Sequence, residues 1–460
     1  MIEKAVIKKI KEIIPSAGVL VGDEEKICYS YDASIKEALP DIIVKADTAD
    51  EISSVIKIAS EHNIPIIPRG AGTGFAGGTV PVRGGIVISV AGMNKIIEID
   101  RKNLMAVVEP GVITGTLQKE VESLGLFYPP DPSSLDISTI GGNVATCAGG
   151  PRGVKYGVTK DYVMGLDAIL PDGSLLSTGG KNIKSVAGYN LTSLMVGSEG
   201  TLALINKIIL KLLPLPETTS TLFVSFKSIS GATKSINDIL LSGTTPSTIE
   251  FMDRFTIEII RDHIDIEIGK DIGATLLIEL DGDVEEVRRG TDKVKDILLR
   301  GGATDIVTAK DEIERKHLWD ARRGISPTLR KLKPTKLNQD IAVPRASLPE
   351  MIDQLHSIAE KYNILIVNFG HAGDGNIHVN VMTDSSNIEE MGRATKAVDE
   401  IFRQTIELGG TISGEHGIGI SKKDYLEMEV GKAGISVMRK IKGAIDPKNI
   451  MNPGKVLPDL

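Results

Sequence analysis

The sequence predicts an α+β protein with an α/β first domain, an α+β second domain built on an antiparallel sheet, and a helical C-terminal segment. Short apolar runs alternate with amphipathic helix patterns up to residue 215, and this part also holds Gly-rich segments. The sequence Pro214-Leu215-Pro216 then breaks the pattern and marks a domain boundary. Strand and helix patterns alternate again beyond it, which favours a separate α+β domain. We therefore expect domains at 1–215 and 216–400 and the C-terminal segment at 401–460.

Each predicted element of the first domain follows from its pattern of apolar residues. Residues 4–14 read as an amphipathic helix, and 50–62 as a second helix with Ile52, Val55 and Ala59 on one face. Short runs of aliphatic and β-branched residues predict strands at 42–44, 64–68, 85–90, 106–109 and 205–212. A third helix is expected at 114–124.

The same reasoning applies beyond the boundary. Strands are expected at 221–226 and 276–280, and helices at 232–241, 285–299, 394–408 and 425–445. Two apolar runs within 364–382 flank Gly373-Asp374-Gly375, which predicts two strands joined by a tight turn. These strands should close the second sheet, and the tail at 446–455 should be a loop.

Bulk composition excludes several classes of function. The chain has 460 residues, a formal net charge of -8 and a pI of about 5.6, which argues against nucleic acid as the main partner. It has no apolar stretch long enough for a membrane helix, and its N-terminus lacks the apolar core of a signal peptide. Cys28 and Cys147 are too few for a four-cysteine iron–sulfur cluster. We expect a cytoplasmic protein, free or attached to the membrane through a partner, whose electron carrier is organic or belongs to another protein of a complex.

Three of the seven histidines fall in two short segments that also contain a glutamate. His371 and His378 flank the predicted tight turn, which can direct both imidazoles toward one point, and Glu415 supplies a carboxylate. Two histidines and one carboxylate suit zinc, manganese or ferrous iron and leave positions open for a ligand. His416, beside that carboxylate, is the candidate general acid or base. Spacing alone leaves open the alternative of two capped turns with solvated histidines.

Three Gly-rich segments of the first domain together indicate a long polar ligand. Residues 69–78 follow a strand and contain five glycines, whose backbone N–H groups can surround a pyrophosphate. A Rossmann fold is not expected, because the residues after Gly74 cannot continue as the required helix. Residues 139–157 and 188–202 add surfaces edged by Ser, Thr and Asn. Any one of these segments alone could be a structural turn.

Taken together, these segments resemble the flavin-binding domain of the vanillyl-alcohol oxidase / p-cresol methylhydroxylase superfamily. The resemblance is carried by Pro68–Gly78, Pro130–Ser134, Thr139–Gly157 and Gly197–Leu202. With Asn368–His378 and Gly414–Gly417 added, the chain is similar to the glycolate oxidase / D-lactate dehydrogenase branch, which includes D-2-hydroxyglutarate dehydrogenase. The resemblance implies an FAD-binding α/β domain of the p-cresol methylhydroxylase type, an α+β cap domain, and a C-terminal segment that returns to the FAD domain.

The resemblance also implies which residues hold FAD. The pyrophosphate is expected on the first Gly-rich loop and the flavin along the later segments. Non-covalent binding is expected because residues 69–78 contain neither histidine nor cysteine, although Cys147 stays open as an attachment point. The expected cofactor-binding residues are Pro68, Arg69, Gly70, Ala71, Gly72, Thr73, Gly74, Gly77, Pro132, Ser133, Ser134, Gly142, Asn143, Thr146, Gly149, Gly153, Tyr156, Glu199 and Asn452.

The implied reaction is the oxidation of a D-2-hydroxy acid, with D-lactate as the leading substrate. FAD would accept the hydride from C2, which is chemistry that belongs to the cofactor. A divalent metal on His371, His378 and Glu415 would polarise the substrate hydroxyl, and His416 would take its proton. A chelating metal also explains a preference for 2-hydroxy acids, because simple alcohols cannot form the five-membered ring.

The substrate carboxylate also needs a cation, and Arg322 matches the substrate-binding arginine of the resembled family. A guanidinium can hold a carboxylate through two parallel hydrogen bonds. The alternative is a surface arginine balanced by acidic neighbours, and Ser326 and Lys336 are weaker candidates for the pocket. Relatives specific for dicarboxylates carry a lysine shortly before an aspartate such as Asp340, where this chain has Asn338. This difference favours D-lactate or glycolate over a long dicarboxylate.

Reduced FAD must pass its electrons on, and an electron-transferring flavoprotein or an iron–sulfur subunit is the expected partner. The catalytic subunit of a glycolate oxidase and a D-2-hydroxyglutarate dehydrogenase are alternatives within the same branch. Metal-dependent hydrolysis with a nucleotide on the glycine loops is a rival enzyme hypothesis, which a yellow purified protein would exclude. A non-catalytic flavin-binding scaffold is a rival of another class.

Overall fold

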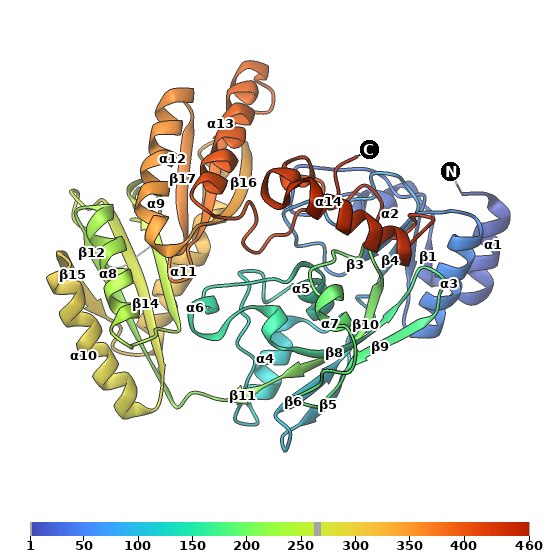
Figure 1. Cartoon of the computed structure of the whole chain (residues 1–460), viewed down its shortest axis with the longest axis horizontal. Helices are drawn as coiled ribbons and strands as arrows, with labels where there is room; N and C mark the ends of the chain where they lie inside the picture. Colours follow the sequence, from blue (N-terminus) through green and yellow to red (C-terminus); the bar gives the residue numbers. More distant parts are fainter. Residues whose placement is uncertain (1, 262–267, 460) are drawn as a thin grey trace. The chain divides into compact units, whose positions relative to one another are not determined.

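The computed structural model describes residues 2–261 and 268–459, which form two compact units (Figure 1). The first unit comprises Met1–Gly149, Val158–Leu215 and Glu415–Leu460, and the second comprises Gly150–Gly157 and Pro216–Gly414. The protein is thus α+β, and most strand pairs in both units are antiparallel.

The first unit contains two sheets flanked by helices. One sheet has the strand order β1-β2-β4-β3, in which β2, β3 and β4 are parallel. The other is antiparallel with the order β5-β6-β10-β8-β9, and β7 and β11 form a separate pair. The strands are β1 (Val19–Leu20), β2 (Ile42–Lys45), β3 (Ile66–Arg69), β4 (Ile86–Ser89), β5 (Ile96–Asp100), β6 (Met105–Val108), β7 (Leu126–Phe127), β8 (Val163–Ile169), β9 (Leu175–Gly179), β10 (Leu204–Lys211) and β11 (Leu213–Pro214). The helices are α1 (Lys4–Ile13), α2 (Asp23–Cys28), α3 (Ala49–Glu61), α4 (Thr114–Glu122), α5 (Ile140–Thr146), α7 (Leu191–Met195) and α14 (Leu426–Ile445).

Helix α3 shows how local sequence sets an element of this unit. Thr48 accepts a hydrogen bond from the Glu51 amide, and the Glu51 carboxylate accepts one from the Thr48 amide, so a capping box begins the helix. The predicted apolar face, which includes Ile52 and Val55, is fully buried against the parallel sheet. The expected helix and its buried face are confirmed.

The second unit is built on a single antiparallel sheet with the order β15-β12-β14-β13-β17-β18-β16. Its strands are β12 (Thr218–Phe226), β13 (Thr248–Asp253), β14 (Ala274–Gly282), β15 (Ala303–Thr308), β16 (Thr335–Ala342), β17 (Leu365–His371) and β18 (Asn376–Thr383). Its helices are α6 (Gly153–Tyr156), α8 (Ile229–Leu241), α9 (Arg254–Ile260), α10 (Val284–Arg300), α11 (Glu312–Leu329), α12 (Leu348–Tyr362) and α13 (Ile388–Glu407). The expected antiparallel sheet is therefore present, with the two strands of 364–382 joined in it by the predicted turn.

The units differ from the expected domain ranges in two places. Helix α13 continues past residue 400 and packs on α12, and the chain after it bridges to β16 through Thr411 and Ser413. The second unit therefore extends to Gly414. It also includes α6, because Lys155 and Tyr156 both donate hydrogen bonds to the Asp281 carboxylate in β14.

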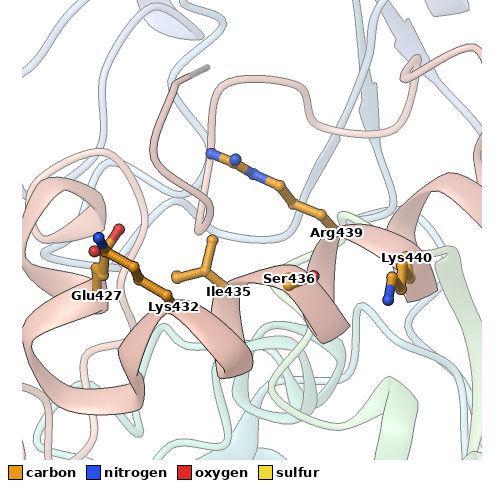
Figure 2. A pocket seen from close by; sticks show the side chains of 6 residues that line it. All are labelled: Glu427, Lys432, Ile435, Ser436, Arg439 and Lys440. Atoms are coloured by element: carbon orange, nitrogen blue, oxygen red, sulfur yellow. The ribbon is translucent and has the colours of Figure 1, made fainter.

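Helix α14 in the C-terminal part of the first unit is kinked at Gly431, which has a φ of 68°. Near it lies a hollow of about 430 Å³ whose lining is cationic (Figure 2). The lining residues are Glu427, Lys432, Ile435, Ser436, Arg439 and Lys440. Arg439 donates to the backbone carbonyl of Pro458 and so holds the C-terminal tail on this helix. None of the helices that the structure describes has the length and hydropathy needed to cross a membrane.

Candidate active site

The two candidate histidines lie at the turn of the β17–β18 hairpin. His371 ends β17 and His378 lies near the start of β18, where it pairs with Phe369. The turn requires glycine, because Gly375 has a φ of 85° and a Cβ there would lie 2.1 Å from the Val343 carbonyl oxygen. Side chains two apart on a strand share a face, so the hairpin presents both imidazoles on one side of the sheet.

The imidazoles face each other through the same ring nitrogen. His371 Nε2 and His378 Nε2 are 3.3 Å apart, and the rings meet edge-to-face. Both side chains are buried. The other nitrogen of His371, Nδ1, lies 2.5 Å from Oε1 of Glu250 in β13. Because an ionised carboxylate only accepts, this contact favours the form of His371 with its proton on Nδ1, in which the Nε2 lone pair faces His378.

Glu250 is itself held by Arg322. Its Oε2 accepts a hydrogen bond of 2.6 Å from Arg322 Nε and also pairs with Nη2 of the same guanidinium. The guanidinium packs on the Phe369 ring, 4.6 Å from its centroid. Burial alone would raise the pKa of Glu250, but the charge of Arg322 together with His371 holds the pKa below its usual value.

Glu415 directly follows Gly414, the last residue of the second unit. The Gly414 amide donates to the Asp340 carbonyl, and Asp340 is the cross-strand partner of His378. His371, His378 and Glu415 offer ligand atoms that all lie within 4.8 Å of one another. Two nitrogens bound to one tetrahedral zinc ion would be about 3.3 Å apart, and the two Nε2 atoms have this separation. The donor set therefore fits a first-row divalent metal.

His416 lies in the first unit, against the predicted cofactor loop. Its ring centroid is 4.9 Å from that of Phe75, which belongs to the glycine-rich segment 69–78. Its Nε2 is 3.6 Å from Glu415 Oε1. The Glu415 side chain in turn lies against Gly149, where a Cβ would be 2.7 Å from Oε2. Within this unit, His416 therefore lies beside the predicted cofactor segment 69–78, and Glu415 lies beside the segment 139–157.

The loop after His416 is held by Glu199. One Glu199 oxygen accepts from the Ile418 amide at 2.7 Å and the other accepts from the Gly419 amide at 2.9 Å. Glu199 is buried, and its φ of 51° is uncommon for this residue type. The prediction that Glu199 contacts the cofactor stays a prediction, but both of its carboxylate oxygens are engaged with this loop.

The pKa of Glu199 predicts how stability depends on pH. Burial raises the pKa of Glu199 to about 7, although two backbone amides that donate to the carboxylate act to lower it. Between pH 4.5 and 7 the folded state therefore keeps a proton that the unfolded state releases. This contribution to the unfolding free energy is complete below pH 4.5 and is lost as pH rises through 7. It amounts to at most about 3 kcal/mol. Glu199→Gln has no titrating group there, so its Tm relative to wild type should rise from about pH 5 to about pH 8. The measurement is thermal unfolding of the FAD-loaded protein across this range.

Glu61→Gln, at an exposed position of the same unit, is the control for this experiment. Its Tm difference from wild type should not change with pH by a comparable amount. Parallel pH curves for wild type and Glu199→Gln would show that Glu199 does not titrate in this window.

The first glycine-rich loop is organised by its own arginine. Arg69 is buried and its Nη1 donates to the Tyr31 carbonyl and to Thr79 Oγ1. Gly72 has a φ of 72°, and a Cβ there would lie 2.3 Å from Arg69 Nη2. Gly70 meets Thr139 in the same way, at 2.3 Å from Oγ1. The glycines therefore let the backbone pass close over buried polar groups, which fits a loop that presents its amides to a phosphate.

Several predicted cofactor residues have side chains engaged within the protein. Asn143 donates to Thr114 Oγ1, and Asn452 donates to the carbonyls of Gly78 and Glu199. Thr146 bonds the Gly142 carbonyl. Gly153 and Tyr156 lie in α6 of the second unit, and the other predicted residues, namely Pro68, Ala71, Thr73, Gly74, Gly77, Pro132, Ser133 and Ser134, lie in the first. The contacts of these residues with FAD stay predictions.

Of the two weaker substrate candidates, Lys336 lies on the same sheet face as His378, and Ser326 lies on α11. Lys336, Asn338 and Asp340 alternate along β16 and pair with Met382, Asn380 and His378 of β18. Lys336 Nζ donates to Ser326 Oγ at 2.7 Å. Burial, with a smaller effect of the Arg330 charge, lowers the pKa of Lys336 to about 8.

Sequence reasoning missed Glu250. Its signal was a single glutamate within the apolar run Thr248-Ile249-Glu250-Phe251-Met252, which predicts a buried strand. A charged residue in such a strand needs a partner, but the pattern does not name which one.

Comparison with known proteins identifies the family. A family model described as the C-terminal domain of FAD linked oxidases matches residues 215–456, and one described as an FAD binding domain matches residues 40–179. The chain belongs to the FAD-linked oxidases. This oxidase is 48% identical over 432 residues to glycolate oxidase subunit GlcD of Bacillus subtilis strain 168, covering 94% of this chain and 92% of that protein. It is 35% identical over 463 residues to D-lactate dehydrogenase of Anaerostipes hadrus, covering 98% and 96%.

Solved structures show the same fold. This FAD-linked oxidase matches p-cresol methylhydroxylase with a TM-score of 0.83 at 20% identity, covering 99% of this chain and 98% of that one. It matches alkyldihydroxyacetonephosphate synthase with a TM-score of 0.79 at 20% identity, covering 98% and 86%. The fold expected from the sequence, an FAD-binding domain of the p-cresol methylhydroxylase type with an antiparallel cap, is confirmed.

Proposed function

We propose that this FAD-linked oxidase is a metal-dependent dehydrogenase that oxidises a D-2-hydroxy acid, with D-lactate to pyruvate as the leading reaction. The observation that carries the metal-dependent part is the pair of buried Nε2 atoms that face each other at 3.3 Å. Two neutral imidazoles with this separation of their Nε2 atoms would both reach one metal ion, which supports the proposal. Relatives named as a glycolate oxidase component and as D-lactate dehydrogenase support a 2-hydroxy acid as the substrate class.

In this mechanism bound FAD would supply the hydride acceptor, and a bound metal would supply a Lewis acid for the substrate hydroxyl. His371, His378 and Glu415 would hold that ion. His416 would take the hydroxyl proton. The substrate thus loses a hydride from C2 and a proton from its hydroxyl, and the C–O bond becomes a carbonyl.

In this proposal Arg322 offers a substrate carboxylate only part of its guanidinium, because the rest of the group binds Glu250. Its Nε and Nη2 already meet Glu250, so a substrate carboxylate would be bound through the remaining Nη1 side. Lys336 and Ser326 would bind a second polar group of a longer substrate. Reduced flavin would pass its electrons to an electron-transferring flavoprotein or an iron–sulfur subunit.

The test is the visible spectrum of the purified protein under anaerobic conditions. Flavin bands should bleach with D-lactate, should not bleach after treatment with a chelator, and should bleach again after a divalent metal is restored. Bleaching that survives complete removal of metal would contradict metal dependence. Absence of flavin after reconstitution with FAD would contradict the whole proposal.

Glycolate oxidation is the second candidate, favoured by the 48% identity to a glycolate oxidase component. The same spectra with glycolate and D-2-hydroxyglutarate decide the substrate. Faster bleaching with glycolate would make this chain the catalytic component of a glycolate oxidase. A preference for D-2-hydroxyglutarate would place the second carboxylate near Lys336.

A further inference from the structure

Glu250 is a fully buried carboxylate at the centre of the second unit's sheet. It lies between the buried Ile249 and Phe251 in β13, with no side-chain exposure. Its two oxygens have different partners: Oε2 faces Arg322 and Oε1 faces His371 Nδ1. A buried ion pair contributes little net stability compared with apolar residues, because desolvation offsets the attraction. This pair does, however, contact the ring of a candidate metal ligand through Glu250 Oε1.

The same sheet contains a second glutamate–arginine pair, and among the described residues no hydrogen bond joins this glutamate to a histidine. Glu279 in β14 is the cross-strand partner of Thr248, and its Oε2 accepts from Arg315, Trp319 and Thr221. Arg315 and Arg322 both lie on α11, seven positions or about two helical turns apart. The second unit thus holds two buried glutamates on neighbouring strands, each bound by an arginine of the same helix. Of these two, Glu250 is the one bonded to His371.

We propose that Glu250 is a positioning residue that holds His371 with its proton on Nδ1 and its Nε2 directed at His378, and that Arg322 fixes the Glu250 carboxylate for this purpose. This inference rests on the proposed metal-dependent function. It also assigns Arg322 an effect on the metal site that is separate from any contact with substrate. Partners that orient a histidine ligand in this way typically change metal affinity about 10- to 100-fold when replaced.

The central variant is Glu250→Gln. A glutamine side chain can accept from Nδ1–H or donate to Nδ1, so it no longer selects one form of the ring. In the single variant Arg322 keeps its buried charge but loses its partner. The double variant Glu250→Gln with Arg322→Gln removes both buried charges and so avoids this unpaired cation. Glu279→Gln is the control for loss of a buried glutamate from the same sheet.

Metal affinity is measured on the FAD-loaded protein by competition with a chelator for Co²⁺ and Zn²⁺. We expect a loss of about 10- to 100-fold in Glu250→Gln and in the double variant, with FAD content unchanged, and less than about a three-fold change in Glu279→Gln. Recovery of affinity in the double variant, or an equal loss in Glu279→Gln, would overturn the proposal, because either result indicates a merely structural role.

A second measurement needs no metal. ¹⁵N spectra of the histidine rings in the metal-free protein should show His371 as the Nδ1–H form in wild type and as a mixture in Glu250→Gln, with the His371 signal assigned by its loss in His371→Ala. An unchanged His371 signal would overturn the proposal. If wild type binds no metal but shows this change, the metal-dependent function fails while the positioning role of Glu250 stands.

Discussion

Replacing His416 by alanine should lower the rate of flavin reduction by about 10²- to 10⁴-fold, the usual contribution of a general base. The variant should still bind FAD and metal, because His416 is not among the three grouped ligand residues and its ring packs on Phe75 of the predicted cofactor loop without being one of the predicted FAD-binding residues. The measurement is anaerobic single-turnover reduction by D-lactate and glycolate, together with FAD and metal content.

His317→Ala is the control for this variant, because His317 is an exposed histidine on α11. Its reduction rate should equal that of wild type. A His416→Ala protein that reduces its flavin at the normal rate would show that another group takes the proton. Loss of FAD from this variant would instead indicate that the histidine supports the loop around Phe75.

Replacing His378 by alanine should weaken metal binding by more than about 100-fold, since even the outer partners of metal ligands account for about 10- to 100-fold. It removes one of the two facing Nε2 atoms and leaves His371 with its Glu250 bond. FAD content should stay normal, because the first glycine-rich loop and its supporting contacts lie in the first unit. The measurement is metal content per flavin after dialysis, followed by flavin reduction with and without added metal.

His371→Ala should give the same loss, and His317→Ala again serves as the control. A His378→Ala protein that retains one metal per flavin would show that the ion, if present, binds elsewhere. Normal turnover without metal in this variant would separate the FAD chemistry from the proposed Lewis acid.

The hairpin shows how far local sequence reaches. The glycines of 373–375 between two apolar runs predict a tight turn, and strand alternation then places His371 and His378 on one face. Turn chemistry and strand period act over a few residues, so they can be read directly from the sequence. The same holds for the capped helix α3 and for the glycine-rich loop 69–78.

The partners of these residues could not be predicted in this way. Glu250 meets His371 across 121 positions in the chain, and Glu199 meets the Ile418 amide across 219. Such contacts depend on strand order and register in sheets assembled from distant segments. No local pattern encodes the neighbour of β17, because many strand orders satisfy the same apolar alternation.

The sequence by itself therefore determined the family and the α+β architecture, and it named the glycine-rich loop predicted to bind the cofactor and the candidate ligand and base residues, since each depends on short motifs or on local apolar patterns. Only the tertiary structure decided what holds them. In the folded structure Arg322 binds Glu250, Glu199 accepts hydrogen bonds from the loop after His416, and the second unit extends to Gly414. The physical reason is that a buried charge must find its partner in the folded core, and that partner is set by packing rather than by its neighbours along the chain.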